Sequence, residues 1–132
     1  MTQDIYITKV ETPEITVSLR KDGIVHVVIK PNTHITIEVQ DRMFEAYCKI
    51  TEIKRPFLIE GGEFVSVTKE ARERSAAKDG EIPRTATALY VKNLGQKIIA
   101  DFYHKINKPK TPVKVFKSFD AGIKWLTENY LD

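Results

Sequence analysis

Short apolar runs alternate with segments of helical periodicity along most of this chain, and this alternation limits the folds that it can adopt. Residues 15–20 alternate apolar and polar side chains, which is the pattern of a strand with one buried face. The pair Asp22-Gly23 suits the positive φ angles of a tight hairpin turn, and residues 24–29 are nearly all apolar and β-branched. The sequence therefore predicts an antiparallel hairpin near its start, with a second strand covered on both faces.

Helices and strands alternate after the predicted hairpin. The first helix has apolar residues at three- and four-residue spacing from Val39 to Ile53, with Thr36 as N-cap and Pro56 ending it. Further helices are predicted at residues 69–78, 94–106 and 119–130, and further strands at residues 57–59, 85–91 and 113–116. These apolar strands are expected inside the sheet or close to its interior, because both of their faces must be dry.

Strands that alternate with helices through short loops become parallel neighbours in a sheet covered by helices. The predicted fold class is therefore α/β: a layered sheet with an N-terminal β-hairpin followed by αβαβαβα. No internal repeat or composition shift marks a boundary, so residues 1–132 are expected to form one domain, with residues 1–13 loosely ordered.

Composition bounds the class of protein. The 132 residues are 42% apolar and 30% charged, which suits one hydrophobic core and disfavours disorder. The lone Cys48 cannot form an internal disulfide, and a structural, half-buried thiol is the favoured interpretation of it. Neither a signal peptide nor a membrane span is readable, so we expect a soluble cytoplasmic protein.

The Gly61-Gly62 pair follows a predicted strand and precedes a helix, where open α/β sheets usually bind ligands. The glycines belong to no Walker A or dinucleotide motif, and Glu60 and Glu63 would repel phosphate, so a flexible turn is favoured over nucleotide binding. A hydroxyl at Ser66 or Thr68 could take part in a phosphoswitch, although capping of the helix explains Thr68 more simply. The candidate interaction loop and helix start comprise Gly61, Gly62, Ser66, Thr68, Lys69 and Glu70.

A second candidate surface is an acid-free stretch between Asp101 and Asp120. Its lysines could attract an acidic partner, an anionic lipid surface or nucleic acid, but no arginine and no stacking motif accompany them. A solvated face is therefore favoured, and no nucleic-acid partner is predicted. The candidate basic rim comprises Lys105, Lys108, Lys110, Lys114 and Lys117.

Catalysis is the weakest of the functional hypotheses. The histidines His26, His34 and His104 fall on a strand, a loop and a helix, without the spacing of a metal site. No nucleophile, base and oxyanion donor can be placed together from the residues, so neither an enzyme nor a cofactor or metal is predicted. A deep pocket that joined His34 or His104 to Glu60 or Glu63 would revive this hypothesis.

The residues that resemble a known family lie mostly in the last third of the chain. They are Ala88-Leu89-Tyr90-Val91, Leu94, Ile98, Phe102, Lys108-Pro109, Pro112-Val113, Val115-Phe116, Ala121 and Trp125-Leu126, together with residues 66–72. Over roughly residues 15–131, the chain resembles small bacterial STAS-like proteins, whose fold is also described as SpoIIAA-like and is shared with anti-sigma-factor antagonists.

This resemblance implies a non-enzymatic regulatory or protein-interaction domain, with a protein partner or self-association as a homodimer. Antagonists of the wider family are switched by phosphorylation of a serine in an Asp-Ser-Ser-Gly-like loop at the start of the second helix. Here Lys69 and Glu70 occupy the places of the Ser-Ser pair, so the usual phosphorylatable motif is missing. The alternative function is carriage of a small apolar or lipid-like ligand between the sheet and a helix such as residues 94–106.

Overall fold

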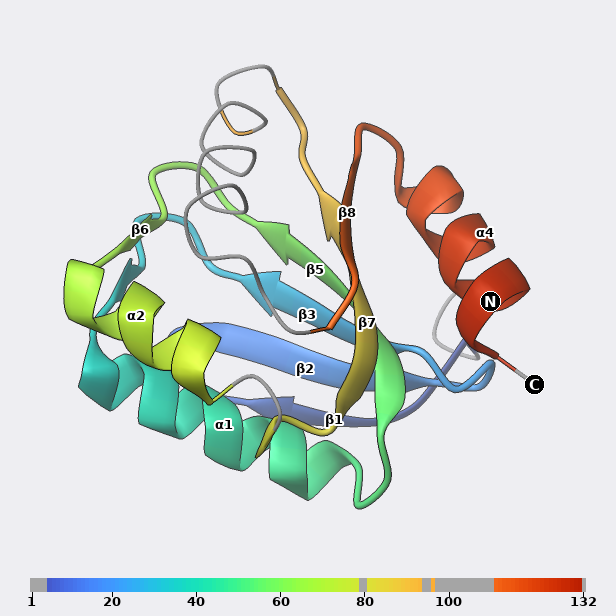
Figure 1. The fold of residues 1–132 in the computed structure, drawn as a ribbon, viewed down its shortest axis with the longest axis horizontal. Helices are drawn as coiled ribbons and strands as arrows, with labels where there is room; N and C mark the ends of the chain where they lie inside the picture. The colour runs from blue at the N-terminus through green and yellow to red at the C-terminus, as the bar shows by residue number, and fades with distance from the viewer. Residues whose placement is uncertain (1–4, 79–80, 94–95, 97–110, 132) are drawn as a thin grey trace.

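The computed structural model describes residues 5–78, 81–93, 96 and 111–131 and shows a mixed α/β fold (Figure 1). Six strands form one sheet in the order β1-β2-β3-β5-β7-β8, which is also their order along the chain. Strands β1, β2 and β3 pair antiparallel, and β3, β5, β7 and β8 pair parallel. Their bounds are Tyr6–Glu11, Ile15–Arg20, Val25–Ile29, Arg55–Gly61, Arg84–Tyr90 and Val113–Phe116.

Helices pack against both faces of this sheet. Neighbouring residues of a strand point to opposite faces, and the adjacent Phe57 and Leu58 of β5 accordingly belong to two separate cores. Phe57 packs with the buried residues of α1 (Ile37–Ile50) and with Ala71 of α2 (Lys69–Ala77), whereas Leu58 packs with Leu126 of α4 (Phe119–Tyr130). The predicted layered α/β fold is therefore confirmed.

The predicted hairpin is the pair β2 and β3. Gly23 has a φ of 92°, and the Arg20 N–H donates to the Ile24 carbonyl at 2.9 Å. A glycine meets this positive φ without steric cost, which is why the Asp22-Gly23 signal was informative. Val25, Val27 and Ile29 are buried on one face, but His26 and Val28 on the other face remain partly exposed, so β3 is not fully covered on both faces.

Part of the segment expected to be loosely ordered, residues 6–11, forms strand β1, whereas residues 1–4 lie outside the described residues. Residues 6–11 pair with β2, although Ile7 is 62% exposed and the strand buries little apolar surface. Backbone pairing and contacts of a few side chains hold such a strand. Because β1 buries little apolar surface, its sequence has no periodic apolar pattern that would have predicted the strand.

The structure corrects three further expectations, which concern the end of α1, the exposure of Cys48 and the position of β8 in the sheet. Helix α1 ends at Ile50, because Thr51 adopts an extended backbone and bonds locally to Ile53, which is 59% exposed rather than on the helix. Cys48 is exposed rather than half-buried, since it lies off the face formed by Val39, Met43 and Ala46. Strand β8, expected near the interior, is at the edge of the sheet within the described residues.

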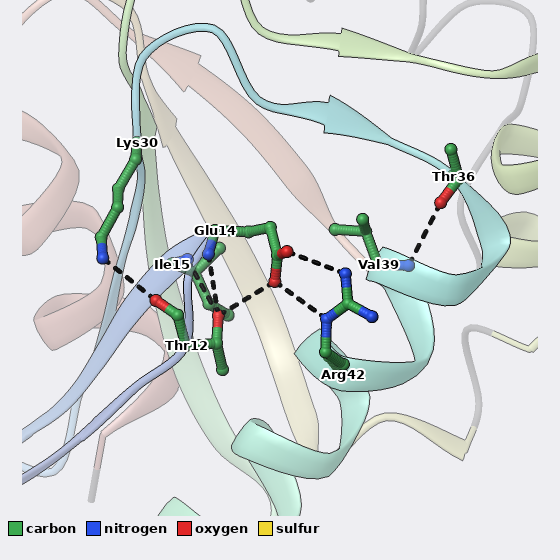
Figure 2. Close-up of polar contacts among 7 residues, drawn as sticks. All are labelled: Thr12, Glu14, Ile15, Lys30, Thr36, Val39 and Arg42. Atoms are coloured by element: carbon green, nitrogen blue, oxygen red, sulfur yellow. Dashed lines mark hydrogen bonds and ion pairs between the residues drawn. The ribbon is translucent and has the colours of Figure 1, made fainter.

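An ion pair between Arg42 and Glu14 joins α1 to the β1–β2 turn (Figure 2). The guanidinium of Arg42 donates to both carboxylate oxygens of Glu14, at 3.1 and 2.8 Å, and Thr36 caps the start of α1 by accepting from the Val39 N–H at 3.3 Å. The hydrogen bonds from Arg42 hold the pKa of Glu14 below its usual value. Bidentate contacts of this kind restrict geometry as well as adding energy.

The predicted helix at residues 94–106 lies outside the described residues, although the Gln96 N–H donates to the Asn93 side chain at 2.8 Å, as a cap at Asn93 requires. None of the helices within the described ranges is long and apolar enough to cross a membrane.

Candidate functional site

Two loops meet at the carboxyl ends of β3 and β5. We call them the paired loops; they comprise residues 30–36 and 61–68 and include the short parallel strands β4 (His34–Ile35) and β6 (Ser66–Val67). The Gly62 N–H donates to the Ile29 carbonyl at 2.7 Å, and the Asn32 N–H donates to the Glu63 carbonyl at 2.8 Å. Backbone hydrogen bonds thus join the two loops along their length. The turn predicted to be flexible is therefore restrained by the facing loop.

Gly62 allows the loops to approach this closely. A Cβ atom at Gly62 would lie 2.6 Å from the Pro31 backbone nitrogen, which is closer than real Cβ contacts. At Gly61, by contrast, a Cβ atom would make an ordinary contact of 3.7 Å with Val65. The two neighbouring glycines therefore differ in role, and only Gly62 is required by the packing.

Phe64 is the most exposed of the large apolar side chains in the described structure, at 80%. Its φ is 61°, in the left-handed region that a bulky residue rarely occupies, and Asn32 in the facing loop has a φ of 63°. Strained backbone of this kind persists when the surrounding structure dictates it, and it concentrates at functional sites. The paired loops therefore hold an aromatic ring outward at a conformational cost.

The hydroxyls that the sequence singled out have partners in the structure. Thr68 is the N-cap of α2, where its side chain accepts from the Ala71 N–H at 3.1 Å. Ser66 Oγ lies 2.6 Å from Nδ1 of His34 across the β4–β6 pair. The capping interpretation of Thr68 is thus supported by geometry, while Ser66 remains exposed beside an imidazole.

Lys69 and Glu70 are both exposed in the first turn of α2, directly after the paired loops. Lys69 makes an ion pair with Glu73 at 3.9 Å, and both side chains are largely in solvent, so this pair adds little stability. All six residues of the predicted interaction surface therefore lie on one continuous segment. Phe64 and Asn32 could not be found from the sequence, because a positive φ leaves no periodic signal, and His34 was considered there only for catalysis.

A second group of polar side chains lies on the sheet face that α4 partly covers. We call Tyr6, His26, Glu60 and Lys92 the imidazole cluster. The Tyr6 hydroxyl is 2.9 Å from His26 Nδ1, His26 Nε2 is 2.9 Å from a carboxylate oxygen of Glu60, and Lys92 Nζ is 3.4 Å from the other oxygen. The hydrogen bond from His26 keeps the pKa of Glu60 below its usual value against the opposing effect of burial, with the charges of His26 and Lys92 helping.

The imidazole cluster differs from the pairing that the sequence singled out for catalysis. Glu60 meets His26 rather than His34 or His104; His34 lies beside Ser66, and His104 is outside the described residues. His26 was not singled out, because its contact with Glu60 depends on the register of β3 against β5, in which Val28 is the neighbour of Glu60. No sequence pattern encodes that register.

The basic rim is described only at Lys114 and Lys117. Lys114 Nζ lies 5.5 Å from the centre of the Phe116 ring, and Lys117 lines a shallow hollow of about 150 Å³ with Val91, Lys92 and Asn93. The hollow is smaller than the several hundred Å³ that small-molecule sites usually occupy. The remaining residues of the rim, Lys105, Lys108 and Lys110, lie outside the described residues.

Comparison with known proteins places the chain in a family. No curated protein and no solved structure matches it. A family model described as Domain of unknown function (DUF7793) matches residues 17–130, from β2 to the end of α4. Since this match spans most of the chain and includes both the paired loops and α4, the protein belongs to that family.

Proposed function

We propose that the protein is a non-enzymatic interaction domain of STAS-like type that binds a protein partner or a second copy of itself through the paired loops. The observation that carries the proposal is Phe64, whose ring is 80% exposed on a backbone with a φ of 61°. An aromatic side chain on a constrained backbone has only two rotatable bonds, so it loses little conformational entropy when a partner covers it. Such rings are typical anchors of protein interfaces.

The surroundings of Phe64 support this role. Exposed polar groups of Glu63, His34 and Ser66 lie in the same pair of loops and suit the polar rim of an interface. Lys69 and Glu70 extend this surface along the first turn of α2. The partner surface that fits is an apolar pocket ringed by polar groups.

Regulation in this proposal does not depend on the serine motif of the wider family. The Thr68 hydroxyl is engaged as a helix cap, and Lys69 and Glu70 stand in place of the serines. We place the interaction in the cytoplasm, since the chain has a single cysteine and that cysteine is exposed, which suits a reducing compartment.

The test compares capture of partners from the native cell by the wild type and by the variant Phe64→Asn. Asparagine tolerates the left-handed backbone, so the variant should remain folded while the ring is lost. We expect the enriched partner, including any second copy of the chain, to be lost or reduced at least tenfold. The variant Lys69→Ala/Glu70→Ala should weaken capture to a smaller extent.

The matched control is Ile53→Asn, which removes another exposed apolar side chain from a different loop. It should leave capture unchanged. Absence of an enriched partner, or equal capture by Phe64→Asn and wild type, would contradict the proposal.

The carrier alternative requires a pocket beside residues 94–106, which lie outside the described residues. Native mass spectrometry of gently purified protein tests it, because a bound apolar molecule would add a defined mass. It remains a prediction from the sequence.

A further inference from the structure

The imidazole cluster has a hydrogen-bonding arrangement that assigns its protons. An ionised carboxylate only accepts hydrogen bonds, so Nε2 of His26 must donate to Glu60. A neutral imidazole then has its acceptor at Nδ1, and the Tyr6 hydroxyl donates to it. With neutral His26, each of these polar groups has a partner of the right kind.

Protonation of His26 changes the role of Tyr6. Both ring nitrogens of an imidazolium are donors, so the Tyr6 oxygen must accept from Nδ1 and its own proton must turn to water. Tyr6 is partly exposed, which permits this rotation. Both hydrogen bonds of His26 then involve a charged donor, and such bonds are stronger than neutral ones.

The groups that face His26 come from strands β5, β1 and β2 and from helix α4. Glu60 on β5 is in direct contact, and its lowered pKa keeps it ionised in mildly acidic solution. The Tyr6 ring on β1 stacks on the imidazole at 6.0 Å, and the Phe119 ring of α4 meets it edge-on at 5.2 Å. On β2, Ser18 lies directly across from His26 and is uncharged.

Two cations lie near the cluster and oppose the charge. Lys92 is paired with the second oxygen of Glu60 at 3.4 Å, and Arg20 is paired with Asp22 at 2.9 Å while lying over the Phe119 ring. Arg20 therefore has a separate carboxylate partner, whereas Lys92 shares the Glu60 carboxylate with His26. Within the part of the chain that the structure describes, the charged group hydrogen-bonded to the imidazole is the Glu60 carboxylate.

The contact between Tyr6 and His26 crosses an intervening strand. Tyr6 is on the edge strand β1 and His26 is on β3, with β2 between them. Ile7, Thr8 and Lys9 of β1 are exposed, so this side-chain bond is one of few that tie the strand to the sheet. We propose that Tyr6, His26 and Glu60 form an acid-tightened latch, in which protonation of His26 fastens the N-terminal edge strand to the sheet.

The test is hydrogen exchange of the β1 backbone amides at pH 8 and pH 5.5, corrected for the intrinsic effect of pH. Histidines change charge within this range, and Glu60 stays ionised throughout it. In the wild type we expect the protection of residues 6–11 to rise at least threefold on acidification, relative to the amides of β5. In Tyr6→Phe and His26→Gln this rise should disappear, whereas His34→Gln should retain it because His34 lies in the paired loops.

The latch would be overturned by an unchanged protection of β1 in the wild type, or by the same rise in His26→Gln. The nitrogen chemical shifts of His26 provide a second readout, since the neutral ring should carry its proton on Nε2. A proton on Nδ1 would be equally contradictory. Phe64→Asn should keep the latch, so failure of the interaction proposal and failure of this one are distinguishable.

Discussion

At the scale of single residues, glycines that look equivalent in the sequence have different roles. The Gly61-Gly62 pair marked a loop between strand and helix, and the structure separates the two positions by what surrounds each one. Gly61 is the last residue of β5 and has room for a methyl group, whereas Gly62 lies against the Pro31 backbone. The different roles of Gly61 and Gly62 therefore come from the facing loop, which approaches Gly62 closely.

The variant Gly62→Ala should destabilise the protein by about 1–3 kcal/mol, because the added methyl group clashes with backbone that has little freedom to move. Gly61→Ala is the matched control and should change the free energy of unfolding by less than about 1 kcal/mol, in either direction. Urea unfolding of the two variants measures the difference. Equal destabilisation by both would show that the approach to Pro31 does not constrain the loop.

The conformation of Phe64, like the role of Gly62, depends on the facing loop rather than on the local sequence. The sequence shows an ordinary aromatic residue after Gly61-Gly62-Glu63, and no local pattern indicates its φ of 61° or its exposed ring. Its conformation comes from the hydrogen bonds between two loops that are about 30 residues apart in the chain.

At the scale of elements, capping signals located the helices well. Thr36 and Thr68 each accept a hydrogen bond from the backbone N–H three residues later, as the sequence predicted, and Ser118 does the same at the start of α4. Helix ends and edge strands were harder, because Thr51 ends α1 through a local turn and β1 lacks a buried face. Both depend on hydrogen bonds rather than on apolar periodicity.

Removal of the Thr36 cap should weaken α1. In Thr36→Val the side chain keeps its shape but loses the oxygen that accepts from Val39, so we expect a loss of about 1 kcal/mol in the free energy of unfolding. Thr36→Ser retains the acceptor and should lie close to the wild type. Chemical denaturation followed by circular dichroism makes the comparison, and a serine variant as unstable as the valine variant would argue against the cap.

At the scale of the whole molecule, two lowered carboxyl pKa values make stability depend on acid. The pKa of Glu14 is lowered by Arg42, and the pKa of Glu60 is lowered by His26. A carboxyl group with a lower pKa in the folded state contributes stability above its unfolded pKa and loses it as the pH falls through the folded one. Stability should therefore decline below about pH 4.5, the ordinary value for such carboxyl groups.

The variant Glu14→Gln should reduce this acid sensitivity. Its melting temperature should be lower than that of the wild type at pH 7, since the contact with Arg42 loses its charge, and the two temperatures should converge toward pH 3. Thermal melts at several pH values check this expectation. Glu11→Gln is a suitable control, because the contacts of the Glu11 side chain with Lys9 and Thr16 are exposed, and its melting profile should match the wild type.

The sequence by itself determined the fold class, the antiparallel hairpin and the position of most elements, because periodicity, caps and the Asp22-Gly23 turn act over a few neighbouring residues. Only the tertiary structure decided which side chains meet. The register of β3 against β5 brings Glu60 to His26, the approach of two loops turns Phe64 outward, and the β1–β2 pairing brings Tyr6 within reach. Contacts between distant segments depend on how elements pack, and local patterns carry no record of that packing.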